Sequence, residues 1–343
     1  MKIGSLFTGY GGLDMAIGGE LAWVSEIEKS ACIVHEAHHP NVPNLGDIKK
    51  IDWTTVPKVD VLTGGYPCQP FSHAGLRKGE NDERHLWPNV REAISVLRPR
   101  LVLLENVRGH VTLGLREVLG EIAELGYGAR WGIVRASDAG APHQRARVFI
   151  AAYPEGNGGN ERPDGFDSPD GGGTWLQVAT RGGDQFASDS NGRQFSGASA
   201  DGNVVSVASE RSIQPASDTD SGGHGEQQDT RRVGGMEAGT EDEASERERS
   251  RGIANSGSHT DWGKYTDAIV RWEKVTGRRA PFPTVHANGK DRLNPVFCEW
   301  MMGLPLGWVT GHGLSATKEL KMLGNGVVPQ QARLAVSLLE RMN

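Results

Sequence analysis

Short apolar runs and helix-spaced apolar residues alternate along the first 153 positions of the chain. The continuous runs predict strands at Lys2–Phe7, Ala22–Glu26, Val59–Leu62, Leu101–Leu104 and Val148–Tyr153. Apolar residues at helical spacing predict helices from about Leu13 and over Lys29–His38, Trp87–Leu97 and Leu115–Leu125. This strand–helix alternation is typical of an α/β fold with a doubly wound, mostly parallel sheet.

The composition changes after Tyr153. Residues 154–260 are rich in Gly, Ser, Asp, Glu and Arg, and they bury too little apolar surface to offset the entropy of ordering. We therefore expect a polar, largely flexible insert there. Further elements are expected at Trp262–Val275 (helix), Pro281–Val285 (extended), Pro295–Met302 (helix) and Gln330–Met342 (helix).

The insert also carries most of the negative charge. The chain has a formal net charge of -6, but Glu155–Thr260 holds 19 acidic and 9 basic residues, a net of -10. The remaining 24 acidic and 28 basic residues give a net of +4. A mildly basic body of this kind is compatible with binding to a phosphate backbone.

Cysteine usage and hydropathy exclude several classes of protein. Three cysteines occur, Cys32, Cys68 and Cys298, without C-x-x-C spacing, which indicates a reducing compartment and argues against a disulfide framework or a zinc site. No apolar run is long enough to span a bilayer, and the first residues lack the layout of a signal peptide. We expect a cytoplasmic protein with no metal site and no membrane contact.

Cys68 lies in the tetrad Pro67-Cys68-Gln69-Pro70, directly after the Val59–Leu62 strand and two glycines. Proline cannot continue a ladder of hydrogen bonds, so the strand must stop at Pro67. Open α/β sheets place their chemistry at such strand ends. A free cysteine is more often a small buried apolar side chain, but the two prolines favour a reactive thiol at the rim of the sheet.

The turns after the first strands carry groups suited to an adenosine-type cofactor. The glycine-rich turn Phe7–Asp14 lacks the G-x-G-x-x-G spacing of dinucleotide enzymes. Glu26 ends the second strand, where an acidic residue can hold ribose hydroxyls. Asp47, which we place at the end of a third strand, can accept a hydrogen bond from an adenine amino group. These positions predict a cofactor without a pyrophosphate.

Three further charged residues follow or precede buried strands. Glu105 ends the Leu101–Leu104 strand, where a carboxyl group is costly unless it is paired or used. Beside Cys68 it would complete a nucleophile and acid pair. Arg145 and Arg147 stand at alternating positions before the late strand, so we expect both to point the same way, orienting Glu105 and lowering the pKa of the thiol.

In the order of these motifs the chain resembles DNA cytosine-5 methyltransferases of bacterial or phage type. The matching segments are Phe7–Gly12, Glu26, Asp47, Gly65–Ser72, Glu105–Val107, His143–Arg147, Arg292–Pro305 and Gly324–Pro329. The resemblance implies a class I methyltransferase fold, which is Rossmann-like, with a small target-recognition domain. It also implies S-adenosylmethionine as cofactor, bound by Phe7, Gly9, Gly11, Gly12, Glu26, Asp47, Ile48, Pro67 and Asn325.

The same resemblance divides the chain. Residues 1–153 would form the catalytic domain, and 292–343 would return to it with the C-terminal helix. Target recognition would continue from the insert, residues 154–260, into residues 261–291. Within that region Thr284-Val285 resembles the Thr-aliphatic pair beside the flipped-base pocket, although Thr284 can equally be a plain strand threonine.

The resemblance implies a covalent mechanism on a cytosine flipped out of duplex DNA. Cys68 would attack carbon 6 while Glu105 holds ring nitrogen 3 and the amino group, so that carbon 5 can take the methyl group. Arg145 and Arg147 complete the catalytic set. The segment Ser72–His85 would close over the DNA and exclude water.

The chain departs from the family pattern in three places. His143 stands where a glutamine is usual in the Gln-x-Arg-x-Arg motif. The usual Glu and Arg between Pro295 and Gly303 are replaced by Phe297 and Trp300, which questions how the small domain docks on the sheet. Gly326 stands where a serine usually follows the asparagine.

Three other functions remain in competition. An RNA cytosine-5 methyltransferase shares the Pro-Cys-Gln-Pro motif, but the Cys-Phe-Thr tripeptide of such enzymes is absent. A non-catalytic DNA-binding relative conflicts with the presence of every expected catalytic residue. A nicotinamide oxidoreductase requires the phosphate-binding fingerprint that the first turn lacks. The expected partners are double-stranded DNA and a cognate restriction enzyme, and the protein is expected to act as a monomer.

Overall fold

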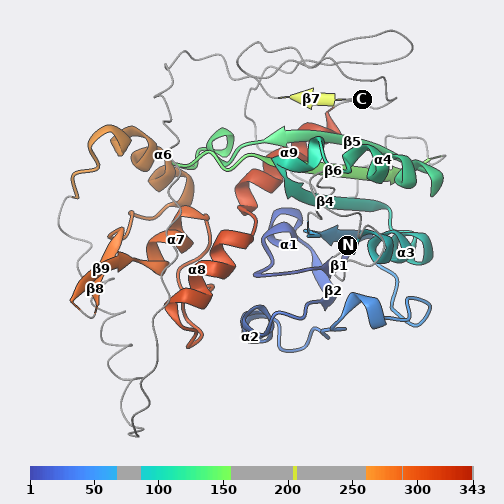
Figure 1. Cartoon of the computed structure of the whole chain (residues 1–343), viewed down its shortest axis with the longest axis horizontal. Helices are drawn as coiled ribbons and strands as arrows, with labels where there is room; N and C mark the ends of the chain where they lie inside the picture. The colour runs from blue at the N-terminus through green and yellow to red at the C-terminus, as the bar shows by residue number, and fades with distance from the viewer. Residues whose placement is uncertain (68–85, 156–203, 207–259, 288, 342–343) are drawn as a thin grey trace, which may run out of the picture.

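The computed structural model describes residues 1–67, 86–155, 204–206, 260–287 and 289–341, and its centre is a mixed sheet (Figure 1). The strands of this sheet are β1 (Lys2–Leu6), β2 (Glu20–Ser25), β3 (Val61–Gly64), β4 (Leu101–Val107), β5 (Tyr127–Val134), β6 (Arg147–Pro154) and β7 (Val204–Ser206). Their order is β2-β1-β3-β4-β6-β5-β7. A separate hairpin pairs β8 (Thr284–Ala287) with β9 (Lys290–Leu293).

The helices flank this sheet and continue into the C-terminal part. They are α1 (Gly12–Ile17), α2 (Lys29–His38), α3 (Trp87–Leu97), α4 (Leu115–Glu124), α6 (Thr266–Thr276), α7 (Pro295–Met301), α8 (Ala316–Asn325) and α9 (Pro329–Glu340). The α2 and α3 ranges match the sequence predictions residue for residue. No helix within the described ranges is both long and apolar enough to cross a membrane.

The prediction of a doubly wound, mostly parallel sheet is confirmed. Strands β1 to β4 pair in parallel, whereas β6 pairs antiparallel with both β4 and β5. Residues 135–146 join β5 to β6 without a crossover helix, and strands joined in this way run antiparallel. Strand β5 is not predicted by the sequence pattern, because Gly128, Arg130 and Gly132 interrupt its apolar residues.

The prediction of a strand ending at Asp47 is wrong. The segment before it makes an isolated parallel bridge, Val24 to Asn44, and Asp47 then caps the short 3-10 helix η1 (Ile48–Lys50). Pro43 cannot donate to a ladder and Gly46 takes a φ of 76°, so pairing along β2 stops after one bridge. Asp47 still lies beyond the outer edge of β2.

Two apolar layers cover the sheet, as the alternation along β4 shows. Val102 and Leu104 face the layer built by α3 and α4, whereas Leu101 and Leu103 face the layer of α1 and α9. All four side chains are at most 1% exposed, which confirms the prediction of a strand buried on both faces. Residues that continue β4 therefore project alternately toward these two layers.

A third apolar cluster joins α2 to the C-terminal part of the chain. Its centre is Trp272 of α6, whose indole N–H donates to the Trp300 carbonyl of α7 at 2.9 Å. Figure 1 shows α6, α7 and α8 beside the sheet, with the β8–β9 hairpin projecting from them. The predicted helices at Trp262–Val275 and Pro295–Met302 correspond to α6 and α7.

Most of the expected insert, residues 154–260, lies outside the described residues. Within it, β7 pairs in parallel with β5 and forms the edge of the sheet. The division of the chain into a catalytic domain, an insert and a recognition region stays a prediction.

Candidate functional site

The strand order puts the ends of β1 and β3 side by side at one edge of the sheet. The chain leaves β1 toward β2 on one side and leaves β3 toward β4 on the other, so these two strands flank the topological switch point. Ligands of open α/β sheets bind outside the carboxyl ends of strands at such a point. Phe7–Gly11 follows β1 and Gly65–Pro67 follows β3, so the two motif segments meet there.

The turn after β1 is shaped by left-handed residues. Phe7, Gly9 and Gly11 have φ values of 53°, 57° and 83°. No atom lies within 4 Å of the place where a Cβ on Gly9 would stand, so the turn is open at that point. A non-glycine residue such as Phe7 adopts this conformation only when its surroundings hold it there.

Glu26 holds this turn directly. Its Oε2 accepts the Gly9 N–H at 2.9 Å, and its Oε1 accepts the Ile27 and Glu28 N–H groups, both at 2.8 Å. The Glu26 N–H donates to Asn44 Oδ1, and the Asn44 side-chain amide donates to the Glu26 carbonyl. The next side chain, Ile27, is 69% exposed and offers an apolar surface beside the carboxylate.

A partly buried carboxyl group lies beneath the same turn. Asp14 accepts the Ser5 hydroxyl at 2.8 Å and the Thr63 hydroxyl at 2.6 Å, so it links α1 to β1 and β3. The Thr8 hydroxyl donates to Ser5 Oγ at 3.1 Å and brings the turn into this network. Burial raises the pKa of Asp14. The sequence analysis did not identify this residue.

Glu105 and Arg147 form an ion pair at the end of β4. Arg147 Nε lies 2.9 Å from Glu105 Oε1, and the Glu105 side chain is 10% exposed. The two residues belong to neighbouring antiparallel strands. Burial raises the pKa of Glu105 to about 7 even though Arg147 and Arg145 act against that rise. At neutral pH this carboxyl group is therefore divided between its protonated and ionised forms.

Asn106 projects to the opposite face of β4 and fixes the approach to the cysteine motif. It is 3% exposed, and its amide donates to the Tyr66 carbonyl at 3.1 Å. The Tyr66 hydroxyl pairs with His110 Nε2 at 2.7 Å. This anchors the residue just before Pro67. Cys68 itself lies outside the described residues, so its role stays a prediction.

Arg145 and Arg147 both act to lower the pKa of Glu105, but they have different hydrogen-bond partners. Arg145 has a φ of 40° and precedes β6, so the alternation of an extended strand does not reach it. Its guanidinium donates to the carbonyls of Gly324 and Gly326. Arg145 thus positions the residues on both sides of Asn325, whose own side chain lies in an exposed stretch.

His143 occupies the glutamine position of the motif. Both of its ring nitrogens are buried without a hydrogen-bond partner in the described part of the protein. Burial and the neighbouring Arg145 and Arg147 lower its pKa to about 4. The imidazole is therefore neutral at pH 7, like the amide it replaces.

Although Phe297 and Trp300 replace the usual Glu and Arg between Pro295 and Gly303, Glu299 places a buried carboxylate in the same segment. It is 0% exposed and accepts the N–H groups of Gly307, Val309 and Thr310 at 2.8, 2.6 and 3.0 Å. The Arg278 guanidinium donates to the nearby Leu304 carbonyl. Glu299 therefore organises the loop after α7.

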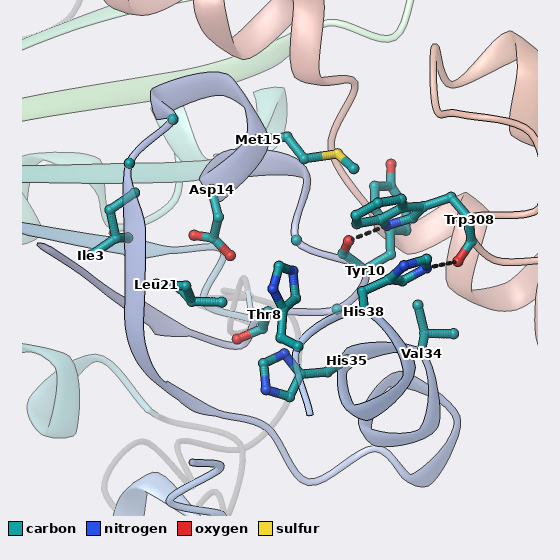
Figure 2. Close-up of a pocket in the computed structure, with 15 residues that line it drawn as sticks. Ile3, Thr8, Tyr10, Asp14, Met15, Leu21, Val34, His35, His38 and Trp308 are labelled. Carbon is teal, nitrogen blue, oxygen red and sulfur yellow. Dashed lines mark hydrogen bonds between the residues drawn. The ribbon is translucent and has the colours of Figure 1, made fainter. Parts of the chain in front are cut away.

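A cavity of about 180 Å³ lies behind the turn (Figure 2). Thr8 and Tyr10 of the turn, Asp14 of α1, His35 of α2 and Trp308 contribute to its walls. The predicted cofactor residues Glu26, Asp47 and Pro67 do not line it. The cavity and the predicted cofactor site therefore share only the turn. Among the described residues, no group of three His, Cys, Asp or Glu side chains is arranged to hold a metal ion.

Comparison with known proteins gives consistent matches. A family model described as C-5 cytosine-specific DNA methylase matches residues 1–340. Type II methyltransferase M.DsaV of Dactylococcopsis salina is 36% identical over 168 residues, which cover 47% of this chain and 48% of that protein. Type II methyltransferase M.BanI of Aneurinibacillus aneurinilyticus is 36% identical over 164 residues, 44% of this chain and 38% of that protein. The matches thus span about half or less of these relatives.

A solved structure supports the fold. The crystal structure of a DNMT2 mutant from Spodoptera frugiperda superimposes with a TM-score of 0.52 over 98% of this chain and 99% of that chain. The sequence identity is 16%, so the likeness concerns the fold alone. Because the family model covers nearly the whole length, and the motif segments meet at one edge of the sheet, the chain belongs to the C-5 cytosine-specific DNA methylase family.

Proposed function

We propose that this protein transfers a methyl group from S-adenosylmethionine to carbon 5 of a cytosine in double-stranded DNA, through a covalent bond from Cys68 to carbon 6. The observation that carries the proposal is the Glu105 carboxyl group. It is buried at the end of β4, paired with Arg147, and has a pKa of about 7. A carboxyl group poised near neutral pH can give a proton to a ring nitrogen and take it back.

The residues around the β1 turn fit S-adenosylmethionine. Gly9 leaves open space beside the backbone, and the Glu26 carboxylate is fixed by three backbone N–H groups while keeping acceptor capacity for ribose hydroxyls. Asp47 uses Oδ1 to cap η1, which leaves Oδ2 for an amino group. The exposed Ile27 side chain suits the face of an adenine ring. When bound, the cofactor supplies an electrophilic methyl group.

We infer the protein side of the reaction from the chemistry of Cys68, Glu105 and Arg147. The Cys68 thiolate attacks carbon 6 of the cytosine, and Glu105 protonates nitrogen 3, so that the electron pair of the ring becomes available at carbon 5. Arg147 holds Glu105 in place through its Nε. After carbon 5 has taken the methyl group, a base removes its proton, and the electron pair of that bond expels the Cys68 sulfur from carbon 6 as a thiolate. Glu105 then recovers the proton from nitrogen 3.

The partners follow from the same proposal. The target base must leave the stack before its carbon 6 is accessible to a thiol, so the substrate is a duplex that the protein opens locally. The relatives are named type II methyltransferases, which supports a cognate restriction enzyme as a functional partner in the cytoplasm. We propose that the protein acts as a monomer, with residues 154–291 contributing target recognition.

Trapping of the covalent intermediate tests the proposal. Duplex DNA containing 5-fluorocytosine cannot lose a proton from carbon 5, so the protein should remain attached to it after methyl transfer. We expect a denaturation-resistant protein–DNA complex that requires S-adenosylmethionine and is absent with Cys68→Ser. Trapping on tRNA but not on duplex DNA would instead favour the RNA enzyme, and no trapping on either would contradict the covalent mechanism.

A further inference from the structure

Tyr10 connects the β1 turn to the segment that follows α8. It is 3% exposed, and its hydroxyl donates to the Val327 carbonyl at 2.8 Å. Burial raises its pKa, so the phenol remains a neutral donor. The Tyr10 carbonyl in turn accepts the Trp308 indole N–H at 2.8 Å (Figure 2). Both the side chain and the backbone of Tyr10 are thus held by the C-terminal part of the chain.

Gly326 has no Cβ because the Tyr10 ring occupies its place. A Cβ built on Gly326 would lie 1.9 Å from Tyr10 Cε1, 2.2 Å from Cζ and 2.6 Å from the hydroxyl oxygen. The backbone of Gly326 has a φ of -78° and a ψ of -176°, which any residue can adopt. The glycine is therefore required by contact and not by conformation.

Gly12 shows the same close approach from the other segment. A Cβ on Gly12 would lie 2.2 Å from the Val327 carbonyl oxygen. The β1 turn and residues 326–327 therefore interlock, with a missing side chain on each side. Gly326 directly follows Asn325, and Arg145 holds the carbonyls of Gly324 and Gly326.

We propose that Tyr10 and Gly326 are a coupled pair of positioning residues that set the distance between the β1 turn and Asn325, and thereby the affinity for S-adenosylmethionine. This rests on the proposed function of the site. The phenol oxygen lies 2.6 Å from the ideal Cβ of Gly326, so it brings a hydroxyl close to the position of a serine side chain. The departure at Gly326 is thus compensated by Tyr10, and neither residue needs to contact the cofactor.

We predict that a substitution at either Tyr10 or Gly326 weakens cofactor binding, by an amount that depends on the residue at the other position. Tyr10→Phe keeps the ring but leaves the Val327 carbonyl without the phenol, so binding of S-adenosylmethionine should weaken about tenfold. The KM for the cofactor should rise by a similar factor, while kcat should change by less than about twofold. The reason is that Tyr10 supports cofactor binding equally in the ground state and in the transition state, and the loss of such uniform binding raises KM and leaves kcat unchanged.

A matched control is present in Tyr127. It is 1% exposed and donates to the Pro99 carbonyl at 2.8 Å, as Tyr10 does to Val327, but it lies on β5 away from the turn. Tyr127→Phe should lower the melting temperature as Tyr10→Phe does and leave the dissociation constant for S-adenosylmethionine unchanged. Calorimetric titration well below both melting temperatures compares the two variants.

A double-mutant cycle then tests the coupling. Gly326→Ser should weaken cofactor binding more than tenfold in the presence of Tyr10, because the new Cβ meets the ring. Tyr10→Leu removes the ring atoms that the Cβ would meet, so adding Gly326→Ser to Tyr10→Leu should cost less than about threefold.

The outcomes separate the two proposals. A wild-type protein that does not bind S-adenosylmethionine contradicts the proposed function and the pair with it. If the wild type binds S-adenosylmethionine, two results contradict the coupled pair alone. One is an equal loss of affinity from Gly326→Ser in the wild-type and Tyr10→Leu backgrounds, and the other is an equal effect of Tyr10→Phe and Tyr127→Phe on affinity.

Discussion

Arg147 Nε lies 2.9 Å from Glu105 Oε1, and yet the pKa of Glu105 is raised to about 7. An ion pair alone would lower the pKa of a carboxyl group. Burial outweighs the arginine here because the carboxyl group lies at the end of a strand covered on both faces. The pair therefore combines a fixed orientation with a readily exchanged proton, as the role proposed for Glu105 requires.

The first prediction concerns the pH dependence of methyl transfer. Glu105 is protonated below pH 7 and ionised above it, so kcat/KM for DNA should fall as the pH rises through about 7. Glu105→Gln should lower turnover by about 10²–10⁴-fold and abolish that descending limb, because an amide donates a hydrogen bond at every pH. A limb that persists in the variant would assign it to another group.

The second prediction concerns stability, where Glu105 and His143 have opposite effects. The pKa of Glu105 rises from its ordinary value of 4.5 to about 7 in the folded protein. Between pH 4.5 and about pH 7 the folded protein therefore keeps a proton that the unfolded chain has released, and this group makes the protein less stable as the pH rises. The pKa of His143 falls from its ordinary value of 6.5 to about 4 in the folded protein. Between about pH 4 and pH 6.5, His143 therefore stays unprotonated in the folded protein while it is protonated in the unfolded chain. That group makes the protein less stable as the pH falls.

Single variants should reveal these opposing slopes. From about pH 5 to 6, Glu105→Gln should change the slope of the unfolding free energy against pH by about +1.4 kcal/mol per pH unit relative to wild type. His143→Gln should change that slope by about -1.4 kcal/mol per pH unit. Urea unfolding at several pH values measures both differences. Parallel curves for wild type and either variant would show that the group titrates normally in the folded state.

The third prediction concerns Asn106. Its amide donates to the Tyr66 carbonyl just before the Pro67-Cys68 motif, so Asn106→Ala should remove that buried hydrogen bond and shift the attacking thiol. We expect single-turnover methyl transfer to slow about 10²-fold while the affinity for S-adenosylmethionine stays within about threefold. Equal losses in both quantities would point to general damage to the fold.

The fourth prediction concerns Glu26. Glu26→Ala removes the acceptor of the Gly9 N–H as well as the proposed ribose contact, and should weaken S-adenosylmethionine binding by about 1–3 kcal/mol. Glu28→Ala is the control, because Glu28 is a neighbouring exposed carboxylate that pairs with Lys321 at 3.5 Å. Calorimetry showing the same small effect for both substitutions would exclude Glu26 from the cofactor site.

Sequence patterns predicted the parts of the site that depend on strand ends. Glu105 follows an uninterrupted apolar run, so its place near the carboxyl end of β4 could be read from hydrophobicity alone. Glu26 directly follows β2, and its place could be read in the same way. These positions follow from the rule that buried parallel strands are apolar and that polar side chains begin where such strands stop.

The partners of these residues could not be predicted in the same way. The left-handed φ of Arg145 redirects its side chain to Gly324 and Gly326, and a local conformation of this kind leaves no periodic signal. Tyr10 and Val327 are neighbours only after folding. Glu299 was overlooked because its helix was compared with a motif position by position, whereas its carboxylate is defined by the backbone N–H groups around it.

The measurement that tests the central claim most directly is the identity of the methylated base. Purified protein, duplex DNA and S-adenosylmethionine labelled on the methyl group are incubated, and the DNA is digested to nucleosides for mass spectrometry. The account predicts label in 5-methyl-2′-deoxycytidine for the wild type and none for Cys68→Ser. Label on an exocyclic nitrogen of adenine or cytosine, or undiminished 5-methylcytosine with Cys68→Ser, would contradict it.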